Sequence, residues 1–263
     1  MFDVVVIGSG PAGYVAAIRA SQLGLKTLCI EELSNDKGKP NFGGTCLNVG
    51  CIPSKSLLDS SHRYYEVKKN LSDHGIQLGD VKLDLKTMME RKDNIVSKLT
   101  GGIDGLFLTN KVESICGKGR VISKNTVQID KADGSSEKVD AKNIIIATGS
   151  SPIEIPAASF GKHIVDSTGA LAFDSVPKRL GVVGAGIIGL ELGSVWSRLG
   201  SEVTVIEALE DFLPMTDTDI SKESLKEFKK QGLDIQLASK VTSTKELKNL
   251  VKVKYEHQGK EIE

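Results

Sequence analysis

The chain has 263 residues, the length of one large domain or of two ordinary ones. Its 40% hydrophobic and 26% charged residues are typical of a soluble globular protein. Lysine plus arginine and aspartate plus glutamate both number 34, and this zero net charge argues against a nucleic acid or an anionic membrane as a partner. No apolar run approaches the roughly 18 residues of a membrane span. Because Met1 leads directly into a predicted strand, we expect a cytoplasmic protein without a signal or transit peptide.

The first predicted element is a buried strand, Asp3–Ile7, whose apolar run is unbroken. The sequence Gly-Ser-Gly-Pro-Ala-Gly follows at positions 8–13 and opens a helix that is predicted to continue through Leu23. A second strand, Thr27–Ile30, ends at Glu31. Strand, glycine turn, helix, strand and acid together are the fingerprint of a dinucleotide-binding βαβ unit.

Each glycine of this turn has a physical role. Gly8 makes the tight turn, Gly10 lets a pyrophosphate approach the backbone, and Gly13 allows the helix to pack closely on the strand. The phosphates are expected at the helix N-terminus, where free N–H groups and the helix dipole favour anions. Glu31 is expected to accept hydrogen bonds from ribose hydroxyls.

Two cysteines five positions apart follow a polar loop predicted over Ser34–Phe42. Cys46 and Cys51 lie in Gly-Gly-Thr-Cys-Leu-Asn-Val-Gly-Cys-Ile-Pro-Ser-Lys, which spans residues 43–55. In a regular helix their Cα atoms would lie beyond the roughly 4.4–6.8 Å that a disulfide spans. A bridge would therefore need a distorted turn, which the flanking glycines can supply. The spacing is not that of zinc ligands, and the residues alone leave open a catalytic pair or two buried thiols.

This segment resembles the redox-active motif of the flavoprotein disulfide reductases. Its Cys-Ile-Pro-Ser-Lys ending most resembles the dihydrolipoamide dehydrogenases of that family. The resemblance implies that Cys46 is the interchange thiol that meets dihydrolipoamide and that Cys51 faces the flavin. Electrons would pass from dihydrolipoamide to this disulfide, then to FAD and finally to NAD+. A helix N-terminus with Lys55 four residues after Cys51 also favours the thiolate.

Helices and short strands are predicted between the cysteine motif and a second nucleotide unit. Helical patterns run from Lys55 to about Lys69 and from Leu85 to about Asn110. Short β-prone runs follow at Val112–Cys116, Arg120–Ile122, Thr126–Ile129 and Glu137–Val139. A further buried strand, Asn143–Ala147, precedes a Thr-Gly pair that resembles the second FAD fingerprint of the family. A linker is predicted over Ser150–Pro156.

The second nucleotide unit repeats the first one. Strands are predicted over Arg179–Val183 and Val203–Ile206, with a glycine turn and a helix to Leu199 between them. Four glycines and the acid of the first unit recur 176 positions later, as Gly184, Gly186, Gly189, Gly200 and Glu207. Because a carboxylate repels a 2′-phosphate, Glu207 favours NAD over NADP.

A glutamate inside the second glycine helix suggests an ion pair. Glu191 follows Gly189 by two residues in an otherwise apolar run, where a carboxylate needs a partner because an isolated buried charge is very costly. The alternative is an unrelated surface glutamate. In the resembling family, a lysine and a glutamate at the positions of Lys55 and Glu191 form an ion pair beside the flavin ring. We therefore expect a desolvated pair.

The resemblance also assigns cofactor contacts to residues in both units. They are Gly8, Gly10, Pro11, Ala12, Gly13, Glu31, Gly44, Thr45, Lys55, Gly119, Thr148, Gly149, Ser150, Gly184, Gly186, Ile187, Ile188, Gly189, Glu207 and Val241. Cys46, Cys51, Lys55 and Glu191 are assigned to catalysis, and no metal ligand is predicted. Cys29 and Cys116 are interpreted as small core hydrophobes.

The predicted fold class is α/β, with two Rossmann-like dinucleotide-binding domains. Residues 1–149 are assigned to an FAD-binding domain and residues 150–263 to an NAD-binding domain, both incomplete. Members of the resembling family are longer and add a further FAD segment and a C-terminal dimerisation domain with a catalytic histidine. We therefore expect an N-terminal fragment, truncated before that domain, that does not oxidise dihydrolipoamide at a useful rate.

The parent enzyme implied by the resemblance is a homodimer that serves the lipoyl domains of a 2-oxo acid dehydrogenase or glycine cleavage complex. Glutathione reductase is a weaker alternative, because it would be expected to show Cys-Val-Pro-Lys-Lys and basic residues after the second-site strand. Mercuric reductase also remains open. A nucleotide-binding module without turnover is an alternative from a different functional class.

Overall fold

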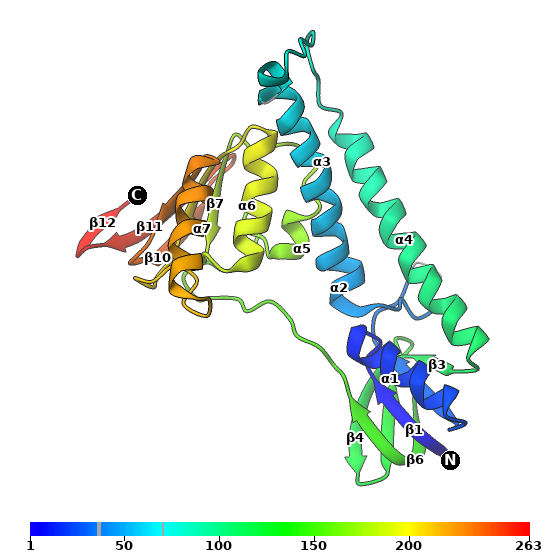
Figure 1. The fold of residues 1–263 in the computed structure, drawn as a ribbon. Coiled ribbons are helices and arrows are strands. Elements are labelled where there is room, and N and C mark those ends of the chain that lie inside the picture. The colour runs from blue at the N-terminus through cyan, green and yellow to red at the C-terminus, as the bar shows by residue number, and fades with distance from the viewer. Residues whose placement is uncertain (36–37, 70) are drawn as a thin grey trace. The chain divides into compact units, whose positions relative to one another are not determined.

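The computed structural model describes residues 1–35, 38–69 and 71–263, and Figure 1 shows its helices and strands in chain order. Part of the loop predicted over Ser34–Phe42, residues 36 and 37, lies outside the described residues. The chain forms two compact units, each built from two stretches of sequence. Unit 1 comprises Met1–Pro53 and Asp93–Ser151, and unit 2 comprises Ser54–Lys92 and Pro152–Glu263.

Parallel strands form the centre of unit 1. β1 (Phe2–Ile7) pairs in parallel with β2 (Thr27–Glu31) on one side and with β6 (Ser136–Ile146) on the other. β2 pairs in turn with β3 (Glu113–Cys116), also in parallel. The last four residues of β1 and all of β2 are buried. Burial on both faces explains why these strands read as unbroken apolar runs instead of alternating patterns.

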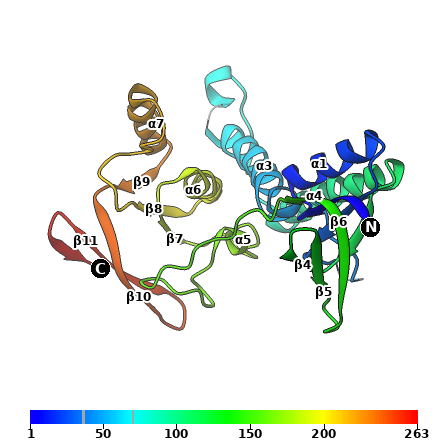
Figure 2. The same ribbon diagram turned by 90° about the horizontal axis from the view of Figure 1, so that it is seen from below.

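Two helices cover one face of these strands. α1 (Pro11–Gln22) connects β1 to β2, and the C-terminal part of α4 (Leu85–Thr109) precedes β3. Val6 of β1 and Phe107 of α4 belong to one buried core cluster, together with apolar residues of α1. In Figure 2, α1 and α4 lie on one side of β6.

An antiparallel meander covers the other face of unit 1. β4 (Lys118–Ser123), β5 (Thr126–Asp130) and the first half of β6 pair in sequence, which gives a six-stranded sheet of order β3-β2-β1-β6-β5-β4. Val5 of β1 and Val127 of β5 are fully buried in a second cluster. Because neighbouring residues of a strand point to opposite faces of the sheet, Val5 and Val6 pack into different core clusters.

A smaller parallel sheet forms the centre of unit 2. Its order is β7-β8-β9, made of β7 (Arg179–Val183), β8 (Glu202–Ile206) and β9 (Leu233–Gln236). α6 (Ile187–Leu199) connects β7 to β8, and α7 (Thr218–Lys230) connects β8 to β9. This is the second predicted βαβ unit, extended by one more helix and strand.

Trp196 of α6 anchors a second core in unit 2. Its fully buried side chain belongs to a cluster with Leu57 of α3 (Cys51–Lys69) and Met88 at the start of α4. Its indole Nε1 donates a 3.1 Å hydrogen bond to the carbonyl of Ala170, the last residue of the short helix α5 (Ser167–Ala170). α3 and the first turns of α4 therefore pack with the second glycine helix.

Short elements complete the chain. A 3₁₀ helix, η1 (Leu71–His74), follows α3. Three antiparallel strands end unit 2, and they are β10 (Ser239–Glu246), β11 (Val251–His257) and β12 (Lys260–Ile262). Among the described residues, no helix is both long and apolar enough to cross a membrane.

The chain passes between the units at three points. Two of them lie inside helices, between Pro53 and Ser54 in α3 and between Lys92 and Asp93 in α4. The third follows Ser151, two residues beyond the predicted boundary at 149/150. Residues 54–92 were predicted to belong with the first domain, whereas in the structure they group with unit 2 through the Trp196 core. The assignment of one cofactor to each domain stays a prediction.

Candidate active site and nucleotide-binding loops

The first glycine loop has the geometry that a close backbone turn requires. Gly8 has a left-handed φ of +97°, and its N–H donates a 2.8 Å hydrogen bond to the carbonyl of Ile30. A Cβ on Gly8 would lie 2.2 Å from the carbonyl oxygen of Ala147, and one on Gly13 would lie 1.8 Å from that of Gly8. Both distances are far inside van der Waals contact, so any larger residue would displace the backbone.

The cysteine motif begins beside this loop. A Cβ on Gly44 would lie 2.6 Å from the Cα of Gly10, and the N–H of Gly43 donates a 3.0 Å hydrogen bond to the carbonyl of Ser9. α2 (Gly44–Val49) therefore starts at the first turn of α1. Gly10 is the N-cap of α1 and Pro11 is its first residue, where a missing N–H leaves no hydrogen bond unmade.

Other predicted FAD residues gather at the same end of the sheet. The hydroxyl of Thr45 donates a 3.5 Å hydrogen bond to the carbonyl of Ser150, just after the Thr-Gly pair. Gly119 lies against the end of β1, because a Cβ there would be 3.0 Å from Cγ2 of Ile7. The loop, the motif and the segment after β6 thus meet at the carboxyl ends of β1 and β6. This is where an open α/β sheet binds ligands.

Glu31 is locked into this site by backbone and side-chain donors. Its Oε2 accepts a 2.9 Å hydrogen bond from the N–H of Ser9 and a second from the Ser9 hydroxyl. Its Oε1 accepts a 2.8 Å hydrogen bond from the N–H of Leu33. The residue is only 5% exposed, and these three donors compensate the burial of its charge.

A helix break separates the two cysteines and supplies the distorted turn that a bridge between them would need. α2 ends at Val49, its C-cap Gly50 has a non-helical φ of −137° and ψ of −115°, and α3 begins at Cys51. A Cβ on Gly50 would lie 3.2 Å from the Cα of Cys46, so the chain folds back toward the first cysteine. Cys46 is half-buried beside the first core cluster and Cys51 is exposed. The disulfide and the roles of the two thiols stay predictions.

Asn48 supports this motif, and sequence reasoning missed it. Its side-chain amide donates hydrogen bonds to the carbonyls of Phe42, at 3.1 Å, and Gly44, at 2.9 Å. Its Oδ1 accepts a 2.8 Å hydrogen bond from the Asn41 amide. An amide in the last turn of a six-residue helix is the signal that could have indicated this role.

Lys55 and Glu191 form the predicted ion pair inside unit 2. Lys55 Nζ contacts Glu191 Oε1, and the hydroxyl of Ser54 donates a 3.3 Å hydrogen bond to Oε2. Within the chain itself the Lys55 side chain is 59% exposed and that of Glu191 is 25% exposed, so the described residues do not bury the pair, and the expected desolvation stays a prediction. Such a pair stabilises a fold by about 0.2–1 kcal/mol, less than a buried pair.

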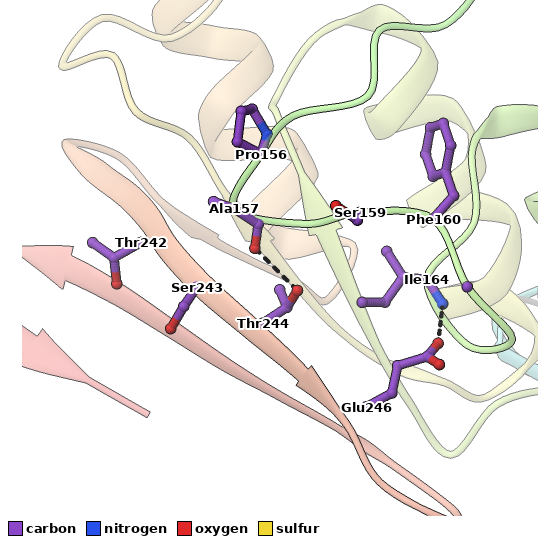
Figure 3. A pocket seen from close by; sticks show the side chains of 10 residues that line it. Pro156, Ala157, Ser159, Phe160, Ile164, Thr242, Ser243, Thr244 and Glu246 are labelled. Atoms are coloured by element: carbon purple, nitrogen blue, oxygen red, sulfur yellow. Dashed lines mark hydrogen bonds between the residues drawn. The ribbon is translucent and has the colours of Figure 1, made fainter.

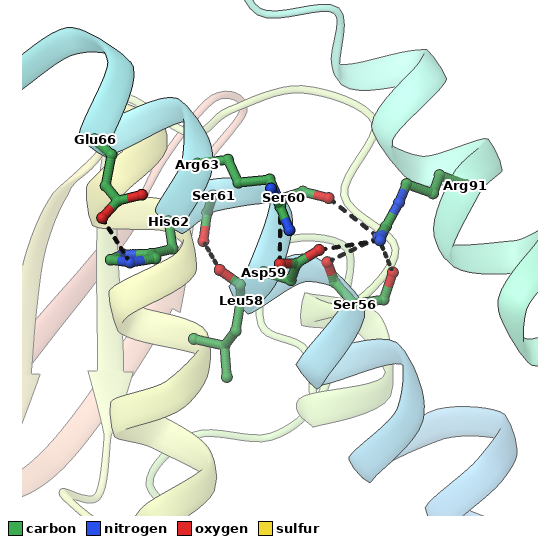
Figure 4. A network of polar contacts seen from close by, with 9 residues as sticks. All are labelled: Ser56, Leu58, Asp59, Ser60, Ser61, His62, Arg63, Glu66 and Arg91. Carbon is green, nitrogen blue, oxygen red and sulfur yellow. Dashed lines mark hydrogen bonds and ion pairs between the residues drawn. The ribbon is translucent and has the colours of Figure 1, made fainter. Parts of the chain in front are cut away.

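Arg91 of α4 fastens the α3 segment that carries Lys55. Its guanidinium donates to the hydroxyls of Ser56, at 3.0 Å, and Ser60, at 3.3 Å, and pairs with Asp59 at 3.0 Å (Figure 4). Lys92, the next residue, is buried and donates a 3.0 Å hydrogen bond to the carbonyl of Leu171. These contacts were not predicted, since no local pattern relates residues more than 30 positions apart.

The second glycine loop repeats the backbone of the first. Gly184 has a φ of +98°, and its N–H donates a 2.9 Å hydrogen bond to the carbonyl of Ile206. A Cβ on Gly189 would lie 2.4 Å from the carbonyl oxygen of Gly184. By contrast, apart from the glycine and its two chain neighbours, no heavy atom of the described residues would lie within 4 Å of a Cβ on Gly184 or Gly186. The open backbone at these two glycines leaves room for a pyrophosphate.

The acid of the second loop is held by two backbone donors. Glu207 Oε2 accepts a 2.7 Å hydrogen bond from the N–H of Ala185, and Oε1 accepts one of 2.9 Å from Leu209. The predicted neighbours Ile187 and Ile188 are exposed on the first turn of α6. Val241 is buried on β10, and its cofactor contact stays a prediction.

The two remaining cysteines differ in burial. Cys29 lies fully buried in β2, and burial together with the nearby Glu31 raises the pKa of its thiol to about 12. Cys116 is half-buried at the end of β3, and the same two causes raise its pKa. The prediction of a core hydrophobe is confirmed for Cys29 and holds only partly for Cys116. A raised pKa makes either thiol a poor nucleophile.

A pocket of about 270 Å³ lies elsewhere in unit 2, between the segment after the third crossing and β10 (Figure 3). The Glu246 carboxylate accepts hydrogen bonds from the N–H groups of His163 and Ile164, and the Thr244 hydroxyl donates to the carbonyl of Ala157 at 3.0 Å. These bonds fasten the crossing segment to β10. No predicted site residue lines this pocket.

A family model, described as pyridine nucleotide-disulphide oxidoreductase, matches residues 2–263 of the chain. The chain belongs to this family. Members use FAD and NAD(P), so both predicted cofactor classes are those of the family. The predicted α/β fold with two Rossmann-like units is likewise confirmed.

Relatives in this family are similar along almost the whole chain. A dihydrolipoyl dehydrogenase of Cupriavidus necator is 52% identical over 257 residues, which cover 97% of this chain and 54% of the relative. A leghemoglobin reductase of Vigna unguiculata is 54% identical over 91% of this chain and 45% of the relative. The chain therefore spans about half the length of the curated relatives that it matches.

Solved structures agree with this family membership. The flavoprotein disulfide reductase RclA of Escherichia coli superposes with a TM-score of 0.81 at 26% identity, in a Cu(II) complex. The superposition covers 99% of this chain and 54% of that chain. The fold of almost the whole chain therefore occurs in a flavoprotein disulfide reductase.

Proposed function

We propose that unit 1 binds FAD and carries a redox-active Cys46–Cys51 disulfide, and that unit 2 binds NAD, as part of a dihydrolipoyl dehydrogenase. The observation that carries this proposal is the close approach of Gly44 to Gly10. It brings the cysteine motif to a dinucleotide loop, which a pair of core thiols would not require. The names of several relatives at 50–52% identity support the same activity.

The thiols would exchange disulfides with dihydrolipoamide in two steps. A substrate thiolate attacks Cys46 Sγ, and Cys51 Sγ leaves as a thiolate; the second substrate thiol then attacks the substrate sulfur of the mixed disulfide, and Cys46 leaves. Lipoamide is thereby oxidised, and two electrons reside on the cysteine pair. The loop of residues 8–13 and Glu31 would hold FAD, which when bound would supply the two-electron relay between this cysteine pair and NAD+. Cys51 is the first residue of α3, at the positive end of the helix dipole, and Lys55 follows it by four residues.

Glu207 supports NAD instead of NADP as the second cofactor. Its carboxylate is partly exposed beside the open Gly184 loop, and it would repel a 2′-phosphate. The Cys-Ile-Pro-Ser-Lys ending and this acid argue against glutathione reductase. Lipoyl domains as partners, a homodimeric parent and a cytoplasmic location belong to the same proposal, although several relatives carry mitochondrial in their names. The expectation that this chain alone does not turn over dihydrolipoamide stays a prediction.

The test uses the purified chain with added FAD. We expect FAD to remain bound through gel filtration, and we expect dithiothreitol to open a bridge between Cys46 and Cys51, detected by differential alkylation and mass spectrometry. Cys46→Ser and Cys51→Ser should each abolish the bridge, whereas Cys116→Ser, the matched control, should keep it. A chain that neither retains FAD nor contains a reducible bridge would contradict the proposal.

A further inference from the structure

The two glycine loops differ in the residue that lies between their first two glycines. The first loop has Ser9 and the second has Ala185, at equivalent positions 176 residues apart. Both residues are buried and both donate their backbone N–H to the acid 22 residues later. Only Ser9 has a hydroxyl, and this hydroxyl also donates to the acid.

This hydroxyl changes how many hydrogen bonds the first acid can still accept. A carboxylate oxygen has two lone pairs in its plane. In Glu31, the N–H and the hydroxyl of Ser9 use both lone pairs of Oε2, and Leu33 uses one of Oε1. One acceptor position remains, on Oε1.

The second acid keeps one position on each oxygen. Glu207 Oε2 accepts only from Ala185, and Oε1 accepts only from Leu209, among the residues that the structure describes. Glu207 is also partly exposed, whereas Glu31 is buried. A vicinal diol donates two hydrogen bonds side by side, so it can bind both oxygens of Glu207 but not both of Glu31.

We infer that the residue between the first two glycines sets how many ribose hydroxyls each acid accepts, one at Glu31 and two at Glu207. Ser9 is thus a positioning residue that closes one oxygen of the first acid. Ala185 is a specificity-determining residue that leaves the second acid open to an intact ribose diol. This inference rests on the proposed function, because it takes a ribose-containing dinucleotide as the ligand of each loop.

The first experiment adds the hydroxyl to the second loop. NAD+ and its adenosine 2′-deoxy analogue are titrated calorimetrically into the chain and into Ala185→Ser. The variant should bind NAD+ about 2- to 12-fold more weakly, which corresponds to one lost hydrogen bond. It should bind the deoxy analogue with nearly unchanged affinity, so the preference for the intact diol contracts. Ala185→Gly, which adds no hydroxyl, and the exposed control Ala172→Ser should keep the preference of the unaltered chain.

The reciprocal experiment removes the hydroxyl from the first loop. Ser9→Ala should raise the preference for FAD over its adenosine 2′-deoxy analogue by a similar factor, measured by flavin fluorescence on binding to the apo chain. This arm also carries the test if Ala185→Ser does not fold. Unchanged preferences in both variants would overturn the inference, as would an equal contraction in Ala185→Gly.

A control at the acid itself separates this inference from the proposed function. If NAD+ binds and Glu207→Gln weakens its binding, but Ala185→Ser leaves the preference unchanged, only the inference fails. If NAD+ does not bind, or if Glu207→Gln leaves its affinity unaltered, the proposed nucleotide site of unit 2 fails and the inference fails with it.

Discussion

Gly8 and Gly184 make the same left-handed turn, with φ of +97° and +98°. The N–H of Gly8 donates to the carbonyl of Ile30 near the end of β2, and that of Gly184 donates to the carbonyl of Ile206 at the end of β8. Their surroundings differ. The space beside Gly8 is filled by the carbonyl of Ala147, whereas at Gly184 no heavy atom of the described residues, apart from the glycine and its chain neighbours, lies within 4 Å of the corresponding position. The first loop is closed over by the segment after β6 and by the cysteine motif. The second loop is open.

The comparison shows that a glycine fingerprint determines a turn but not an environment. Both loops meet the local requirements of a dinucleotide site, since backbone N–H groups lie at a helix N-terminus and an acid ends the next strand. The features that distinguish the two loops come from segments elsewhere in each unit. In unit 1 the cysteine motif is such a segment, because Gly44 lies against Gly10. The following predictions test this difference, starting with the largest expected effect.

Alanine at the turn glycines should separate the closed loop from the open one most strongly. Gly8→Ala adds a Cβ 2.2 Å from a backbone oxygen as well as an unfavourable φ, whereas Gly184→Ala adds only the φ. We expect the free energy of unfolding to fall by more than about 3 kcal/mol for Gly8→Ala and by about 1–3 kcal/mol for Gly184→Ala. Urea unfolding followed by circular dichroism measures both. Equal losses would mean that the close contact at Gly8 relaxes freely.

Neutralising the two acids should also have unequal effects. Glu31→Gln leaves a buried amide that faces three donors. At least one of these donors then points at the amide NH2 group, which is itself a donor, and loses its acceptor. This should lower the free energy of unfolding by about 1–3 kcal/mol. Glu207→Gln should lower it by less than about 1 kcal/mol, because water can reach this partly exposed group. Chemical unfolding of both variants checks the order, and the reverse order would contradict the burial argument.

The open loop should control the choice between the two pyridine nucleotides. Glu207→Ala removes both the ribose acceptor and the negative charge, so NAD+ should bind about tenfold more weakly while NADP+ loses less. Glu31→Ala in the closed loop serves as the comparison and should leave the NAD+/NADP+ ratio unchanged. Competition titrations with both nucleotides give this ratio. If Glu207→Ala leaves it as it was, the selectivity lies outside this loop.

The ion pair on α6 has no counterpart in the first repeat, where Val15 takes the place of Glu191. Replacing Glu191 with valine therefore gives α6 the residue of α1. Because the pair is partly exposed, we expect a loss of only about 0.2–1 kcal/mol in the free energy of unfolding. Lys55→Ala should match this loss, and the double variant should show the small coupling. A loss above about 3 kcal/mol would restore the desolvated pair that the sequence suggested.

The smallest expected effect concerns two carboxylates, the half-buried Asp3 in unit 1 and the exposed Glu246 in unit 2. Bonds from Lys142 and from the Lys26 backbone hold the pKa of Asp3 below its ordinary 3.8. Backbone N–H groups of residues 162–164 hold that of Glu246 below 4.5. Their stabilising contributions are present above these ordinary values and are lost as the pH falls through the lower folded-state pKa. Because salt screens an ion pair, about 1 M NaCl should raise the pKa of Asp3 more than that of Glu246. Carboxyl NMR titrations with and without salt measure both shifts.

Local patterns in the sequence predicted most of the elements and much of the candidate site. The apolar runs before Gly8 and Gly184, the glycine spacing and the acids at 31 and 207 predicted both βαβ units, and each lies where expected. The glycines around the cysteines were predicted only to permit a distorted turn, and the structure places the helix break at Gly50. These features depend on neighbours within about one turn or one strand, and the order of residues determines such neighbours directly.

The environment of the site depended on contacts between residues far apart in the chain. The approach of Gly44 to Gly10, the oxygen of Ala147 beside Gly8 and the Arg91 contacts to α3 all follow from the strand order and helix packing. The grouping of residues 54–92 with unit 2 has the same origin, since Trp196 buries Leu57 and Met88 in its core.

The two acids show what the sequence alone does not determine, namely the environment of each carboxylate. Glu31 and Glu207 occupy equivalent positions in the two predicted βαβ units. The Ser9 hydroxyl and greater burial close one of them, while the other stays partly open. Periodicity determines which side of a strand a residue faces. Only the packed chain decides how many donors reach a residue and how much water remains beside it.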